Sequence, residues 1–169
     1  MRTELYWIAA PSPGRLAIMP RPRGGDWLEE EIQAWRRSGV DLVVSLLAID
    51  EQIDLDLLDE KALCDENDIE FISFSIVDRS VPSSMSDFSK LISRLADGLA
   101  NGKNIAVHCR QGIGRAGLVA ICLLIYAGMD QEAALVSVKS ARGCPVPETS
   151  DQRRWITDFA TSLAVGVAK

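Results

Sequence analysis

Residues 105–127 read IAVHCRQGIGRAGLVAICLLIYA, and this stretch decides how the chain folds. Its first three residues are apolar and indicate a buried strand, while the run from Arg115 to Ala127 indicates a helix. The loop between them holds Cys109 and, six positions later, Arg115, with glycines between the two. This layout predicts a thiol, a ring of backbone amides and a guanidinium around one point in space, which suits a phosphate group.

The composition predicts one globular domain that spans residues 1–169. A net charge of −6 argues against a general affinity for nucleic acid or anionic membranes. No stretch approaches the length of a membrane span, and the first residues contain too short an apolar run for a signal peptide. We therefore expect a cytoplasmic monomer that binds neither nucleic acid nor membrane and draws an anionic substrate to a local positive site.

The cysteines and the single histidine restrict metal and disulfide chemistry. One histidine, His108, rules out a site with several histidines, and the absence of a C-x-x-C pair argues against zinc. A domain of this size needs no disulfides, so Cys64, Cys122 and Cys144 are expected to be core or near-core thiols. Cys64 or Cys144 is a possible redox partner of Cys109. We expect no metal and no cofactor.

Strand and helix patterns alternate along the chain, with no repeat or linker. Aspartate at position 26, three residues before Glu29, resembles a capping box for the first helix. The predicted strands are 5–8, 16–19, 40–47, 69–76 and 104–108, and the predicted helices are 27–37, 54–66, 84–100, 115–127, 130–141 and 150–163. Such alternation indicates an α/β fold with a central, mainly parallel sheet of four or five strands and helices on both faces.

In sheets of this kind, ligands bind beyond the carboxyl ends of the strands. The loop after His108 lies at that edge, and so does the loop after Ile76 that carries Asp78. Successive amides of residues 110 to 115 and the start of the following helix favour a thiolate at Cys109. The phosphate-binding residues are therefore expected to be Arg110, Gln111, Gly112, Ile113, Gly114 and Arg115.

These side chains suit the hydrolysis of a phosphate ester. The thiolate of Cys109 is placed for in-line attack on phosphorus, and Arg115 can bind two phosphate oxygens. The leaving group needs a proton, which we expect from Asp78, held partly desolvated and protonated by its apolar neighbours. Asp87 is the reserve candidate, although a place in the first turn of a helix explains it more simply.

The segment VHCRQGIGRAG resembles the signature of the cysteine-based protein tyrosine phosphatases, and it is closest to the compact dual-specificity branch. That branch includes small bacterial members and phosphatases that act on cell-cycle kinases. The resemblance runs from about residue 40 to residue 159. It implies a nucleophile at Cys109, a phosphate clamp at Arg115, a general acid at Asp78 and a phosphorylated protein or peptide as substrate.

The resemblance also implies supporting residues and one departure. His108 precedes the nucleophile, and a buried hydrogen-bonding role suits it better than a role as general base. The segment 145–152 resembles one that carries a conformational glutamine in some branches, which makes Gln152 a candidate for positioning water. The family usually has Ser or Thr after the arginine, whereas this chain has Ala116. Without that hydroxyl we expect a less depressed pKa at Cys109 and slow breakdown of the phosphocysteine.

Several alternatives remain open at this point. A phosphoinositide or small-molecule phosphatase usually has more basic residues in the loop than the single Arg110. A rhodanese-type sulfur transferase also places a cysteine in an amide-lined loop, but it has no need of Arg115 and Asp78. A phosphate-binding pseudophosphatase is the third alternative, and Ala116 favours it slightly.

Overall fold

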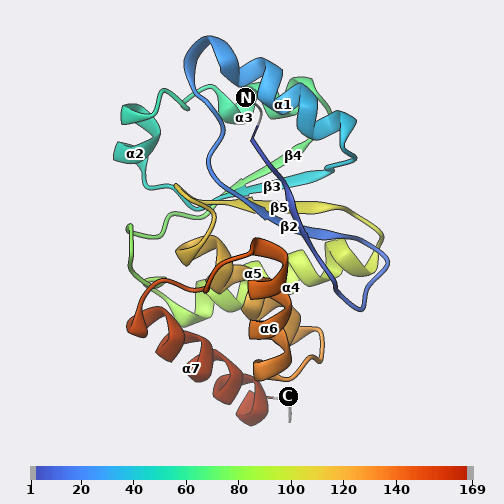
Figure 1. Cartoon of the computed structure of the whole chain (residues 1–169), viewed down its shortest axis with the longest axis vertical. Helices are drawn as coiled ribbons and strands as arrows, with labels where there is room; N and C mark the ends of the chain where they lie inside the picture. Colours follow the sequence, from blue (N-terminus) through green and yellow to red (C-terminus); the bar gives the residue numbers. More distant parts are fainter. Residues whose placement is uncertain (1–2, 167–169) are drawn as a thin grey trace.

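The computed structural model describes residues 3–166 and consists of a five-stranded sheet between two layers of helices (Figure 1). The strand order is β1-β2-β5-β3-β4. Only β1 runs antiparallel to its neighbour, and the other pairs are parallel. The α/β fold with a mainly parallel sheet is thus confirmed. The strands are β1 (Tyr6–Ile8), β2 (Leu16–Met19), β3 (Leu42–Ser45), β4 (Glu70–Ser73) and β5 (Ile105–His108).

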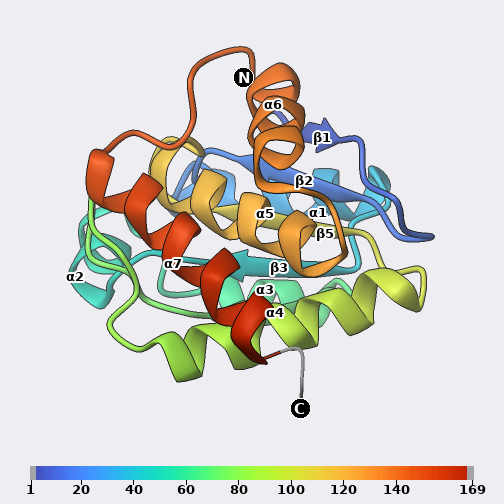
Figure 2. The ribbon, with the colours of Figure 1, turned by 90° about the horizontal axis from the view of Figure 1, so that it is seen from below.

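Helices cover both faces of the sheet (Figures 1 and 2). On one face lie α1 (Leu28–Arg37) and α3 (Glu60–Glu66), and on the other lie α4 (Met85–Ala100), α5 (Gly114–Tyr126), α6 (Gln131–Arg142) and α7 (Ser150–Gly166). The short helices η1 (Gly25–Trp27) and α2 (Ile49–Asp54) complete the set. Helix α5 packs between α4, α6 and α7, and every residue from Gly114 to Leu124 is buried.

Strand residues alternate between two apolar clusters, as the two-residue period of a strand requires. In β5, Ile105 and Val107 point towards the layer of α4–α7, whereas Ala106 points towards α1 and α3. The same alternation carries the side chain of His108 to the α1 and α3 side. In the central strands β2, β3 and β5 both faces of the sheet are therefore closed to solvent, and the site must lie at an edge.

Most predicted elements are confirmed within three residues at their ends. Ser84 caps α4 by accepting a hydrogen bond from the backbone N–H of Asp87, and Asp130 caps α6 in the same way. Aspartate at position 26 does not cap: α1 begins at Leu28 after a 3-10 turn, and no side chain accepts from its first N–H groups. That prediction was wrong because the chain enters α1 through the η1 turn.

The helix predicted for residues 54–66 is confirmed only in its second half, as α3, while α2 ends where that prediction began. Between them the chain reverses at Asp56, whose φ is +57°. Here the chain packs against Gly24, where a Cβ atom would lie 2.0 Å from the carbonyl oxygen of Leu55. The N–H of Gly25 donates to the carbonyl of Asp56 at 3.1 Å. This contact between distant segments interrupts a helix that local propensity favours.

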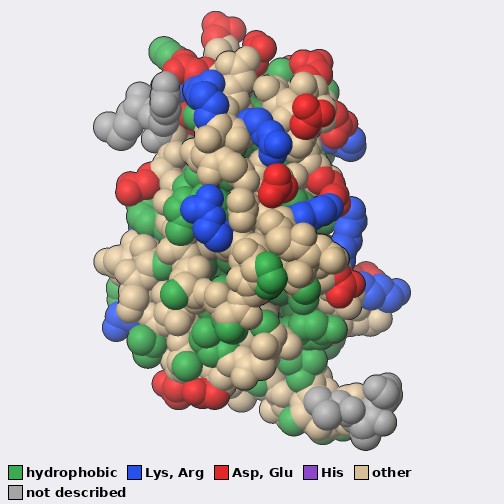
Figure 3. All heavy atoms as spheres, turned by 90° about the vertical axis from the view of Figure 1, so that its right-hand side faces the viewer, with side chains coloured by type: hydrophobic (Ala, Val, Ile, Leu, Met, Phe, Trp, Pro, Cys, Tyr) green, Lys and Arg blue, Asp and Glu red, His purple; other side chains and the backbone are tan. Residues whose placement is uncertain are grey.

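The carboxyl ends of the four parallel strands meet at one edge of the sheet, to the left in Figure 1. The segments that leave this edge are the loop after β2, helix α2 after β3, the loop after β4 and the loop from β5 to α5. Within residues 3–166, no helix is long and apolar enough to cross a membrane. On the face in Figure 3, basic and acidic side chains are interspersed, so that face presents no continuous basic surface to a nucleic acid.

Candidate active site

The loop from β5 to α5 brings Cys109 into a small pocket. The pocket has a volume of about 120 Å³ and is lined by Asp78, Arg79, Cys109, Arg110, Gln111, Arg115 and Glu148. Cys109 is only 2% exposed. The structure thus brings together the predicted nucleophile, clamp and acid, although 31 residues separate Asp78 from Cys109.

The backbone of this loop requires glycine. Gly112 has a φ of +71°, and a Cβ atom there would lie 2.4 Å from the carbonyl carbon of Met19. Any side chain would therefore push the loop away from β2. From outside, Arg142 donates hydrogen bonds to the carbonyl oxygens of Gln111 and Gly112, both at 3.1 Å. The loop is held in shape by contacts on both sides.

Arg115 lies at the start of α5 and is 2% exposed. Its Nη1 donates to Glu51 Oε2 at 2.7 Å and to the carbonyl of Ile76 at 2.9 Å. Its Nη2 donates to Glu51 Oε1 at 2.9 Å and to Asp78 Oδ1 at 3.0 Å. Burial works to lower the pKa of Arg115, but the hydrogen bonds to Glu51 and the nearby negative charges outweigh it and raise the pKa.

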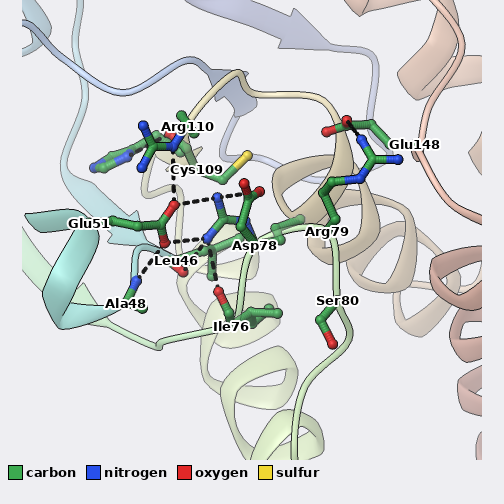
Figure 4. Close-up of polar contacts among 12 residues, drawn as sticks. Leu46, Ala48, Glu51, Ile76, Asp78, Arg79, Ser80, Cys109, Arg110 and Glu148 are labelled. Atoms are coloured by element: carbon green, nitrogen blue, oxygen red, sulfur yellow. Dashed lines mark hydrogen bonds and ion pairs between the residues drawn. The ribbon is translucent and has the colours of Figure 1, made fainter. Parts of the chain in front are cut away.

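Glu51 is the principal residue that sequence reasoning missed (Figure 4). Besides the two bonds from Arg115, its carboxylate accepts from the N–H of Ala48 at 2.9 Å and from Arg110 Nε at 3.3 Å. Burial works to raise the pKa of Glu51, but these donors, Arg115 above all, lower it overall. The place of Glu51 directly after a buried strand, at the edge where ligands bind, was the signal that could have identified it.

Asp78 reaches the pocket but not in the expected environment. Its side chain is 51% exposed, and its Oδ1 accepts from Arg115. The neighbouring Val77 is 70% exposed and gives it no apolar cover. The prediction of a desolvated carboxyl was therefore wrong in the free protein, because the guanidinium of Arg115 and water surround this side chain.

A second ion pair closes the other side of the pocket. Arg79, which follows Asp78 in a left-handed conformation with φ +60°, donates from Nη1 to Glu148 Oε2 at 3.0 Å. Glu148 comes from the segment before α7 and also borders Gly114, where a Cβ atom would lie 2.7 Å from its Oε1. The pair joins the loop after β4 to the segment before α7.

His108 lies behind the site rather than in it. Its Nε2 is 2.6 Å from Glu60 Oε1, and both side chains are buried. Its Nδ1 is 3.4 Å from the carbonyl oxygen of Cys109, and its ring faces Trp35 with centroids 6.2 Å apart. His108 therefore supports the start of the phosphate loop from the α1 and α3 side.

Gln152 is fully buried beneath the rim of the pocket. Its Oε1 accepts from the N–H groups of Glu148 and Thr149, and its Nε2 donates to the carbonyl of Ser80 at 3.1 Å. These bonds connect the segment before α7 to the loop that carries Asp78. All of them go to backbone groups, so in this arrangement Gln152 fixes the two loops, and a role in positioning water stays a prediction.

The other three cysteines are free thiols. Cys64 belongs to the apolar cluster on the α1 and α3 side, opposite the cluster that contains Cys109. Burial raises the pKa of Cys64 and of Cys122 well above the ordinary range, and nearby carboxylates add to the effect at Cys64. Cys144 is half-buried. In residues 3–166, no group of three or more His, Cys, Asp or Glu side chains is arranged to hold a metal ion.

Residues 36–161 match the family described as the dual specificity phosphatase catalytic domain. The chain belongs to this family. It is 30% identical over 144 residues to protein 197R of Invertebrate iridescent virus 6, whose name assigns it provisionally to the tyrosine phosphatases. That match covers 82% of this chain and 50% of the viral protein.

A further curated protein and a solved structure are also similar to this chain. The cyclin-dependent kinase inhibitor 3 of Homo sapiens is 32% identical over 77 residues, which are 44% of this chain and 36% of the human protein. The chain thus spans half the length, or less, of these curated relatives. A crystal structure of the kinase associated phosphatase, with its catalytic cysteine replaced by serine, superposes with a TM-score of 0.88 at 20% identity and covers 97% of each chain.

Proposed function

We propose that this chain hydrolyses phosphomonoesters of proteins, on phosphotyrosine and on phosphoserine or phosphothreonine, through a phosphocysteine. The observation that carries the proposal is the meeting of Cys109, Arg115 and Asp78 in one pocket at the carboxyl edge of the sheet. Membership of the dual-specificity family supports it. A relative named for its association with a kinase supports a phosphoprotein substrate.

In the first step, the Cys109 thiolate attacks phosphorus, an S–P bond forms and the P–O bond to the leaving group breaks. Arg115 and the loop amides of residues 110–115 hold the equatorial oxygens, where negative charge collects. Asp78 gives its proton to the departing oxygen. Glu51 holds Arg115 through two of its N–H groups, so the guanidinium is oriented before the substrate arrives.

The ion pair between Asp78 and Arg115 has a consequence for the order of events. Arg115 Nη2 donates to Asp78 in the free site, and a phosphate oxygen competes for this donor. Binding of the phosphate therefore releases Asp78 from Arg115 and frees it to take up a proton and face the leaving group. In the second step, water attacks phosphorus, the S–P bond breaks, Asp78 accepts the proton of the water and phosphate leaves.

The test is phosphate release from a phosphotyrosine peptide and from a phosphothreonine peptide. Cys109→Ser should abolish turnover, and Asp78→Asn should lower kcat by about 100-fold or more, as the loss of a general acid does. Asp87→Asn is the matched control, because it makes the same change on the exposed first turn of α4. Equal activity in Asp78→Asn and Asp87→Asn would refute the assignment of Asp78, and turnover by Cys109→Ser would refute the mechanism.

A further inference from the structure

Each arginine that lines the pocket is already paired with a carboxylate. Arg115 is bound by Glu51 and Asp78, and Arg110 Nε lies 3.3 Å from Glu51 Oε1. Arg79 is paired with Glu148 at 3.0 Å. Figure 4 shows Arg110 with Glu51 on one side of Cys109 and Arg79 with Glu148 on the other. The guanidiniums that could bind a second phosphate group are therefore neutralised by the protein itself.

The charges of this set cancel. Three arginines, at 79, 110 and 115, face three carboxylates, at 51, 78 and 148. A phosphate group that binds Arg115 and displaces Asp78 uses the one guanidinium that its binding frees in the pocket. A second phosphate nearby would lie against Glu148, with no unpaired arginine in the pocket to receive it.

Two further arginines lie close to the loop but outside the lining of the pocket. Arg142 donates to the carbonyls of Gln111 and Gly112 and stacks on the ring of Tyr6 at 4.2 Å. Arg21 donates to the carbonyl of Pro22, and neither side chain lines the pocket.

We propose that Glu148 is a specificity-determining residue, which limits the pocket to substrates that carry one phosphate group and rejects those with a second phosphate beside it. The proposal rests on the proposed function and names its substrate class as singly phosphorylated segments of proteins. Glu148 acts in two ways, because it pairs with the exposed Arg79 and repels an incoming anion. It comes from the segment before α7, which Gln152 ties to the loop of Asp78 and Arg79.

The experiment compares one phosphotyrosine peptide in two forms, with serine or with phosphoserine next to the phosphotyrosine. The quantity measured is the ratio of kcat/KM for the singly and the doubly phosphorylated peptide. The wild-type chain should prefer the singly phosphorylated form. Glu148→Gln should lower this ratio by about three- to tenfold, the effect of one carboxylate about 6 Å from one or two phosphate charges in a water-like dielectric.

Two controls test whether a change in the ratio arises from the charge at the pocket. Glu66→Gln makes the same change on the exposed end of α3, away from the pocket, and should leave the ratio at its wild-type value. The double variant Arg79→Gln/Glu148→Gln should return the ratio to the wild-type value, because the charges again cancel. A ratio in Glu148→Gln within twofold of that in Glu66→Gln would overturn the proposal, as would a wild-type preference for the doubly phosphorylated peptide.

Failure of the proposed hydrolytic function can be distinguished from failure of the proposed role of Glu148. If the wild-type chain released phosphate from neither peptide, the hydrolytic function would be wrong. The selectivity would then be measured as the ratio of the dissociation constants of the two peptides. This ratio would be compared between the Cys109→Ser variant and the Cys109→Ser/Glu148→Gln double variant. The same three- to tenfold change is expected there, and its absence would overturn the role of Glu148.

Discussion

Replacing Glu51 by glutamine tests how the clamp is held. The change keeps the shape of the side chain and removes its charge. It leaves Arg115, which is 2% exposed, with the carbonyls of Leu46 and Ile76 and the exposed Asp78 as its remaining acceptors. Two charge-assisted bonds, of 2.7 and 2.9 Å, are weakened at once.

The magnitude follows from the burial of the pair. Removing one partner of a buried ion pair costs about 3–5 kcal/mol of folding free energy, because the other charge stays buried. Arg115 keeps three acceptors and the amide oxygen of the new glutamine, so we expect a loss of about 2–4 kcal/mol. For a domain of this size that corresponds to a melting temperature lower by about 5–15 °C.

The pH dependence has a definite sign. The pKa of Glu51 in the folded chain is below its ordinary value of 4.5. Its contribution to stability is therefore fully present above about pH 4.5 and is lost as the pH falls through the lower, folded pKa. The difference in unfolding free energy between the wild-type chain and Glu51→Gln should be constant near neutral pH and shrink below about pH 4.5.

The assay is thermal and urea unfolding, with Glu66→Gln as the control for an exposed carboxylate on α3. Tungstate should raise the melting temperature of Glu51→Gln more than that of the wild-type chain, because the oxyanion supplies the charge that Arg115 has lost. The reasoning is refuted if Glu51→Gln melts within about 1 °C of Glu66→Gln and tungstate stabilises both equally.

Three further changes test the loop and its support. Ala116→Ser should raise the steady-state rate and shrink the burst of product in rapid-mixing kinetics, and a wild-type time course without a burst would contradict a slow second step. Gly112→Ala should lower kcat/KM by about tenfold or more, since a Cβ atom there meets Met19 and φ is positive; unchanged activity would mean that the loop tolerates a shift. Glu60→Gln should lower the unfolding free energy by about 2–4 kcal/mol, because it breaks a buried contact of 2.6 Å to His108, and an unchanged urea midpoint would count against that contact.

Much of the architecture follows from patterns that are local in the chain. The apolar strand 105–108, the glycine-containing loop and the buried helix that begins at Gly114 are contiguous, so residue type and spacing suffice to predict them. The pocket residues Cys109 and Arg115 come from this one stretch. The place of Asp78 in the pocket was predicted from the fold class, because the loops after parallel strands meet at one edge of the sheet.

Other features depend on contacts between segments that are far apart in the sequence. Arg115 and Glu51 are 64 positions apart, and Arg79 and Glu148 are 69 positions apart. No period or spacing encodes such pairs, since their geometry arises only when the sheet and its helices pack. The same reason explains the break between α2 and α3, which a contact with Gly24 imposes on a sequence with helical propensity.

By itself, then, the sequence determined the α/β order, the loop around Cys109 and the chemistry that its cysteine and arginine permit. Only the tertiary structure decided which carboxylates meet each arginine and that Asp78 is exposed beside Arg115. Backbone propensity acts over a few residues, whereas the pairing of buried charges depends on which side chains share the same low-dielectric space after folding.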